Sequence, residues 1–309
     1  MSMRFRFIFS FSLIFFSKLL FAGVNDSIKV YCKIINNNKF FTGTVFHYGI
    51  EKKNILEFKI KDNVFSFLLP PSTVPGVYQL QFDSSQEKKH IDIIVSGKEK
   101  SIVFDVNMYG SYVEPVFAVS NENKNWYGYL QKSKKSIERL NGLFDYLSNF
   151  HTKSNKIDRS VMRIYQNERD KYYKLFNDFV KINSNSWCGL MVLNKPYYFS
   201  NLRKPPVARD FIRKNYYWEG IDTNNSKLIY TPIYKELIDL YFDKYYLNPI
   251  ETYTSTQKEY NLKKGIDIVI KKFSYNSYTR EFVMSYLKDL FKRLEMHDMI
   301  IYVNQKEIF

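Results

Sequence analysis

The spacing of apolar residues changes near residue 120, and this change restricts the chain to a mixed fold. Before it, apolar and polar residues alternate, as they do from Ile28 to Ile34. Alternation is typical of a strand with one buried face. After it, apolar residues recur at helical spacing, for example in residues 157–179. We therefore predict an α+β chain, with an antiparallel β-sandwich or open barrel followed by an all-helical, bundle-like domain.

Turn residues separate the expected strands. Lys61-Asp62-Asn63 lies between two alternating runs and predicts a hairpin, and Pro75-Gly76 marks a later connection. Further alternating runs cover residues 78–82, 91–95 and 102–106.

Two helix starts can also be read from the sequence. Thr231 precedes Pro232, which suits the first turn of a helix because proline has no amide hydrogen to leave unpaired. Thr254, followed three positions later by Gln257, matches a capping box. The last strong helical stripe runs over residues 282–294.

Residues 1–22 have the three parts of a secretory signal peptide. Arg4 and Arg6 precede an apolar stretch, and Ala22 supplies the small residue before the expected cleavage point. Lys18 interrupts the stretch, which is shorter than the ~20 residues of a membrane span. We predict an exported protein of the periplasm or cell envelope, without a lipid anchor because no cysteine lies at the cleavage point. The predicted parts are residues 1–22 (signal peptide), 23–118 (β-rich domain) and 119–309 (helical domain).

The chain is basic, with a formal charge of +15, or +12 once the three cations of the leader are set aside. A basic protein can bind nucleic acid, an anionic membrane or acidic glycans. The lysines are scattered in short pairs, which favours a solvated surface. Because an exported protein seldom meets nucleic acid, we do not expect it as a partner.

No catalytic constellation is evident. The four histidines are far apart in sequence, so no zinc motif is present, and there is neither a phosphate-binding glycine loop nor a Gly-x-Ser-x-Gly elbow. We predict no metal and no cofactor. Two acidic side chains could still meet in space, and the sequence does not say which.

Trp187-Cys188-Gly189-Leu190-Met191 invites comparison with the redox motif Trp-Cys-x-x-Cys, but Met191 replaces the second cysteine. A two-cysteine exchange reaction is therefore excluded at this position. The other cysteine is Cys32, and whether the two pair stays open, with two separate buried thiols as the simpler expectation.

The densest mixture of rings and cations covers residues 197–218. Aromatic and arginine side chains are enriched at interfaces, so this segment is a candidate surface for a peptide, glycan or membrane. The alternative is a helical segment with buried rings and solvated charges. The candidate residues are Tyr197, Tyr198, Arg203, Arg209, Arg213, Tyr217 and Trp218.

Several short sequence segments occur in an order that is typical of a known family. They are Phe41-Thr42-Gly43-Thr44 and the segments 74–80, 91–95, 119–123 and 211–222. In this order the chain resembles the N-terminal region of Bacteroidetes-type envelope thioredoxin-like proteins, relatives of the periplasmic oxidoreductase TlpA. In that family a β-domain and a helical region precede a thioredoxin domain. The likeness covers most of the chain after the leader, but the sequence contains no thioredoxin domain and no redox residues of the family.

The resemblance implies an accessory module that docks to a protein partner. We therefore expect a non-catalytic binding protein of the envelope. The alternative is a periplasmic enzyme or binding protein that acts on glycan through residues 197–218. A third possibility is a truncated gene product with little function.

Overall fold

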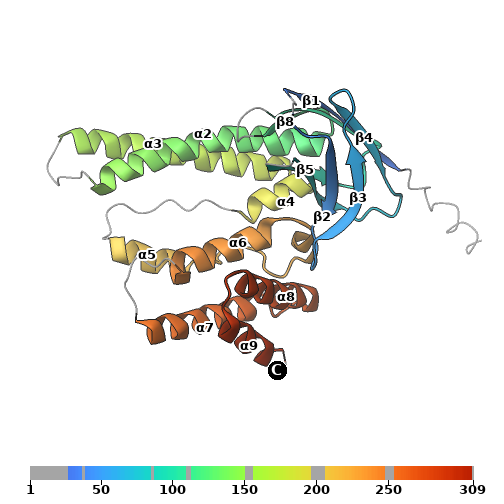
Figure 1. Cartoon of the computed structure of the whole chain (residues 1–309). Helices are drawn as coiled ribbons and strands as arrows, with labels where there is room; N and C mark the ends of the chain where they lie inside the picture. The colour runs from blue at the N-terminus through green and yellow to red at the C-terminus, as the bar shows by residue number, and fades with distance from the viewer. Residues whose placement is uncertain are drawn as a thin grey trace, which may run out of the picture.

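The computed structural model describes residues 27–36, 39–84, 87–108, 113–149, 156–195, 206–247 and 254–307. Within them the strands come first and the helices follow (Figure 1). The α+β prediction is confirmed, whereas the predicted signal peptide lies outside the described residues. The strands are β1 (Ile28–Ile35), β2 (Thr42–His47), β3 (Lys53–Lys59), β4 (Val64–Leu69), β5 (Gly76–Asp83), β6 (Lys88–Val95), β7 (Ser101–Asn107) and β8 (Glu114–Val119).

The strands form two four-stranded sheets. The first sheet has the order β4-β1-β7-β8 and the second sheet the order β3-β2-β5-β6. All neighbouring strands are antiparallel except β1 and β7, which run parallel. The antiparallel prediction therefore missed this pair, because alternation shows which face of a strand is buried but not which strand lies beside it.

The predicted hairpin at Lys61-Asp62-Asn63 forms only its turn. Asp62 and Asn63 both have positive φ angles, and one bridge joins Lys61 to Val64. The strand before this turn, β3, belongs to the second sheet, and the strand after it, β4, pairs with β1 of the first sheet. The turn therefore carries the chain from one sheet to the other.

A core of alternating apolar residues fills the space between the sheets. Phe58 from β3 and Phe65 from β4 stack with ring centroids 4.3 Å apart, and Phe82 and Phe104 pack around them. Such aromatic pairs add stability beyond the area that they bury. This packing explains why β3 and β4, which the turn connects, belong to different sheets. Each strand supplies a ring to the same core from an opposite side.

The helices begin directly after β8, at Asn121. In Figure 1 the hairpin of α2 and α3 lies at one end of the helical part, α5 and α6 follow, and α7, α8 and α9 lie at the other end. The bounds are α2 (Asn121–Asn149), α3 (Lys156–Ile182), α4 (Trp187–Leu193), α5 (Pro206–Asn215), the 3-10 helix η1 (Ser226–Tyr230), α6 (Ile233–Phe242), the π-helix η2 (Asp243–Leu247), α7 (Ser255–Lys272), α8 (Ser277–Arg293) and α9 (His297–Gln305).

Both helix starts read from the sequence are found. Thr254 and Gln257 form the expected capping box at the start of α7. Thr231 Oγ1 accepts a hydrogen bond from the backbone N–H of Ile233, the first residue of α6. These polar groups satisfy amide hydrogens that have no partner inside the helix.

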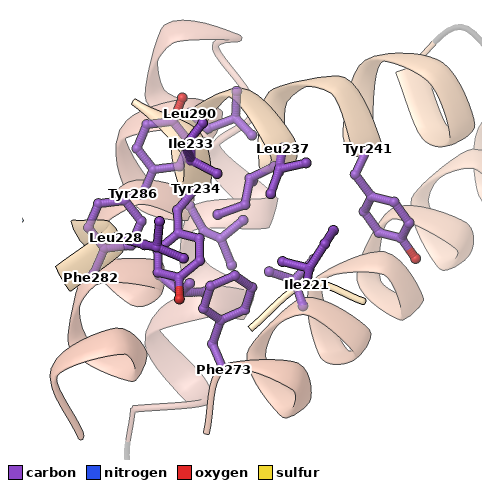
Figure 2. Close-up of a cluster of buried hydrophobic side chains, with 14 of the residues drawn as sticks. Ile221, Leu228, Ile233, Tyr234, Leu237, Tyr241, Phe273, Phe282, Tyr286 and Leu290 are labelled. Atoms are coloured by element: carbon purple, nitrogen blue, oxygen red, sulfur yellow. The ribbon is translucent and has the colours of Figure 1, made fainter. Parts of the chain in front are cut away.

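The helical core is rich in aromatic rings. Figure 2 shows side chains from η1, α6, α8 and the turn before α8 packed together, among them Tyr234, Phe273 and Phe282. The ring of Phe273 lies 4.8 Å from that of Tyr234 in an edge-on arrangement. The same core includes Tyr48, Val77 and Ile94, which belong to the β-part of the chain. Around Val77 and Ile94 the second sheet is therefore covered on both faces, whereas most of β3 is exposed.

Helix α2 closes the free edge of β6. The side-chain amide of Asn123 accepts from the N–H of Ile94 at 2.8 Å and donates to its carbonyl at 2.7 Å. Asn123 thus pairs with the strand as a neighbouring strand would. Tyr127, one helical turn further on, donates to the carbonyl of Asp92 and stacks on Phe117 of β8. The predicted division at residues 118 and 119 stays a prediction, but these contacts join the two parts closely.

Candidate functional site between the second sheet and the helices

Polar side chains gather on the helix-facing side of the second sheet. The register of β5 and β6 places Val77 opposite Ile94 and, two residues along, Gln79 opposite Asp92. Positions two apart share a face of a strand, so this polar row lies next to an apolar row that packs on the helices. Tyr48, directly after β2, completes the group.

Hydrogen bonds link these three side chains. The amide nitrogen of Gln79 donates to the Tyr48 hydroxyl at 2.8 Å and to Asp92 Oδ1 at 3.3 Å. The Tyr48 hydroxyl lies 3.4 Å from Asp92 Oδ1, to which it donates. The Lys52 ammonium donates to the Gln79 side-chain oxygen. The carboxylate therefore accepts from two neutral donors and has a cation one side chain away.

The environment of Asp92 makes its carboxyl a weaker acid than that of an ordinary aspartate. Burial raises the pKa of Asp92 to about 6, and the negative charge of Glu236 on α6 acts in the same direction. The hydrogen bonds from Gln79 and Tyr48 and the charge of His90 oppose this rise. Burial dominates because removing a carboxylate from water costs more than two neutral hydrogen bonds return. Asp92 can therefore exchange a proton near neutral pH.

Helix α6 brings a second cation to the same place. The Lys235 ammonium lies 5.7 Å from the centroid of the Tyr48 ring and 5.7 Å from that of the Tyr286 ring. Burial and the nearby charge of Lys52 lower the pKa of Lys235. The rings compensate in part, because an aromatic face attracts a cation.

A further network on α6 and α8 borders this lysine. Tyr286 donates to Asp239 Oδ2 at 2.7 Å, and Arg293 donates to the Tyr286 hydroxyl at 3.2 Å. Arg293 also pairs with Asp289 at 3.2 Å. We refer to Tyr48, Gln79, Asp92 and Lys235 as the junction cluster; the α6–α8 network lies on its helical side.

Asp92 thus has a raised pKa and acts electrostatically on Lys52, whose own pKa burial lowers. Such a pair is a common sign of a functional site, although structural networks produce it too. Here every hydrogen-bond partner of the Asp92 carboxylate belongs to the chain's own core. The arrangement can hold the sheet on the helices and bind or release one proton. Among the described residues, no three His, Cys, Asp or Glu side chains gather in a way that could hold a metal ion.

Four of the seven residues predicted from sequence cannot be assessed as a surface. Tyr197, Tyr198 and Arg203 lie outside the described residues. Arg209 belongs to α5, but the structure does not describe its side chain.

The other three predicted residues are described and do not form one exposed surface. Tyr217 and Trp218 are buried in the helical core, where the Tyr217 hydroxyl donates to the carbonyl of Leu237 at 2.8 Å. Arg213 is partly buried, with its guanidinium 5.8 Å from the centroid of the Phe144 ring on α2. For Tyr217 and Trp218 the alternative reading, a helical segment with buried rings, describes the structure.

The two cysteines are separate, free and buried. Burial is the main cause that raises the pKa of Cys188 to about 12, and it also raises the pKa of Cys32. The N–H of Cys188 donates to the Glu122 carboxylate at 3.0 Å, which ties α4 to α2. Both thiols are therefore packing residues and are held in their unreactive, protonated form.

Sequence reasoning missed the junction cluster. Asp92 and Gln79 stand at the polar positions of alternating strands, where a solvated face is the ordinary expectation. Only the burial of both faces of the second sheet distinguishes them, and no local signal reports it.

A comparison with models of known protein families returned no match for this chain. A comparison with functionally characterised proteins returned none either.

Proposed function

We propose that the chain is a non-catalytic accessory protein that is exported to the cell envelope and docks a protein partner there. The observation that carries this proposal is the outer face of the first sheet. Its register aligns Tyr31 of β1 with Val103 of β7 and Val119 of β8 in one row. Leu68 and Val116 are 59% and 69% exposed on the same face. Exposed apolar side chains gathered on one face are typical of a surface that a partner covers.

The chemistry of the buried groups supports binding over catalysis. Neither thiol is poised for reaction, and the partners of Asp92 are internal. The alternative reading, glycan recognition through residues 197–218, is weakened because Tyr217 and Trp218 contribute to the core and not to a surface.

The resemblance to envelope thioredoxin-like proteins suggests the kind of partner. In that family the region that this chain resembles accompanies a thioredoxin domain, so a domain with Trp-Cys-x-x-Cys is the partner that we propose. The first sheet would then position that domain.

A photo-crosslinking amino acid at Val116 tests the proposal in producing cells. We expect the protein in the envelope fraction and one discrete crosslinked product, in which mass spectrometry identifies a thioredoxin-type domain. The same probe at Ile164 on α3, which is 54% exposed, is the control and should give no such product. Retention of the protein in the cytoplasm, or the same products from both positions, would refute docking through this face.

A further inference from the structure

Two strongly exposed tyrosines lie at the connection between α7 and α8: Tyr275 in the turn itself and Tyr278 in the first turn of α8. Tyr275 is 80% and Tyr278 64% exposed. Neither ring has a stacking or hydrogen-bonding partner in the described part of the chain. Since a tyrosine ring loses favourable burial when it faces water, two adjacent ones call for an explanation.

The turn that carries these rings is held firmly. Phe273, two residues before Tyr275, is fully buried in the helical core. The Asn276 side chain accepts from the N–H of Tyr278 at 2.9 Å and donates to the carbonyl of Asn224 at 3.2 Å. Thr223 donates to the carbonyl of Lys272 at 2.7 Å. A fixed backbone therefore directs both rings outward, and ordering them on a ligand costs little conformational entropy.

Cations lie close to these two tyrosines in sequence and on the neighbouring η1. Lys271 and Lys272 end α7, both are exposed, and neither makes an ion pair within the described residues. Lys227 on η1 is also exposed, and η1 packs against α8. From residue 268 to residue 280 the sequence contains no acidic side chain.

Two carboxylates belong to neighbouring segments. On the neighbouring loop, Asp222 accepts from the N–H of Asn224 and from the Asn225 side chain. Glu281 follows on α8 and is exposed. The local balance stays positive, as does that of the whole chain.

We propose that the α7–α8 turn docks on an anionic phospholipid surface. Tyr275 and Tyr278 lie at the level of the headgroups, where amphipathic rings are enriched, and Lys271, Lys272 and Lys227 face the phosphates. Two exposed rings with lysines near them in sequence suit a soft, flat surface, because such a surface needs no matching cavity. No helix in the described part of the chain is long and apolar enough to cross a bilayer, so the contact is peripheral. The inference does not use the first sheet and stands apart from the proposed docking of a protein.

Co-sedimentation of the protein without its leader tests this. The probes are phosphatidylcholine vesicles with and without about 30% phosphatidylglycerol, at low and high salt. We expect binding to the anionic vesicles only, and its loss at high salt. The double variant Lys271→Gln/Lys272→Gln should weaken partitioning about 30-fold, since each lysine near such a surface contributes about 1 kcal/mol. Tyr275→Ser/Tyr278→Ser should weaken it as well.

Matched control variants distinguish binding through the α7–α8 turn from a general effect of the protein's positive charge. Lys132→Gln/Lys135→Gln removes the same charge from the exposed face of α2, and Tyr260→Ser removes a ring that is 68% exposed on α7. Both should bind as the parent does, and unchanged circular dichroism shows that each variant folds. Equal losses in the control pair, or equal binding to neutral vesicles, would overturn the proposal. Binding to soluble polyglutamate in place of vesicles would also overturn it, in favour of an acidic protein partner.

Discussion

Replacing Asp92 by asparagine tests the electrostatics of the junction cluster. The pKa of this carboxyl rises from its ordinary value of 3.8 to about 6 in the folded chain. The folded state therefore favours the protonated form. The stability that this group contributes is fully present below the pKa of the unfolded chain and is lost as the pH rises through about 6.

The size of the effect follows from the shift. At 1.36 kcal/mol for each pKa unit, the ionised carboxylate costs the folded protein about 3 kcal/mol at neutral pH. Asparagine has nearly the same shape and never ionises, and its side-chain oxygen can still accept from Gln79 or Tyr48. We expect Asp92→Asn to be close to neutral at pH 3.5 and to stabilise the protein by up to about 3 kcal/mol at pH 7.5.

Urea unfolding at several pH values, followed by circular dichroism, measures this difference. Asp105→Asn on the exposed face of β7 is the control, and it should change the free energy of unfolding by less than about 0.5 kcal/mol at each pH. Comparing each variant with the parent at the same pH cancels the titration of all other groups. The reasoning is refuted if Asp92→Asn destabilises the protein more at pH 7.5 than at pH 3.5, because the carboxylate would then be needed in its charged form.

Three further substitutions and one chemical treatment test the packing. Asn123→Ala should cost about 3 kcal/mol in chemical unfolding, because it leaves a buried N–H and a buried carbonyl of β6 without partners. Gly265→Ala should destabilise the protein by about 1 kcal/mol, since the added carbon would lie 2.8 Å from the Tyr246 ring. In the control Gly142→Ala the added carbon meets nothing within 4 Å, so this variant should be stabilised by a similar amount. A gain in thermal stability for both variants would contradict this packing. Cys188 should resist a thiol reagent at pH 8 until the protein is unfolded, and rapid labelling of the native protein would show that the thiol is accessible.

Local patterns predicted the parts of the fold that depend on neighbours in sequence. The alternation in β1 is visible in the sequence and in the structure alike, since every second residue of that strand is buried. The capping box at Thr254 needs only four consecutive residues, and it forms as expected. The change of period near residue 120 matches the step from β8 to α2.

The sequence did not predict the features that depend on residues far apart in the chain. The parallel pairing of β1 with β7 joins segments about seventy residues apart in the register. Trp218 lies among basic residues and looks like part of a surface, yet neighbours such as Tyr241 and Phe273 bury it. Nothing within residues 197–218 reveals these contacts, because they come from α6 and from the turn before α8.

The second sheet explains why the junction cluster exists at all. A sandwich needs only one buried face on each sheet, and the first sheet keeps its outer face in water. The second sheet instead turns Val77 and Ile94 toward the helices, and Asn123 completes its edge. Once this face is covered, any polar residue on it must find partners inside the protein. Gln79 and Asp92 form hydrogen bonds with Tyr48 and with each other. These bonds do not offset the burial of the carboxylate completely, and the pKa of Asp92 stays raised. The raised pKa of this carboxyl is thus a consequence of packing a β-sandwich against a helical core.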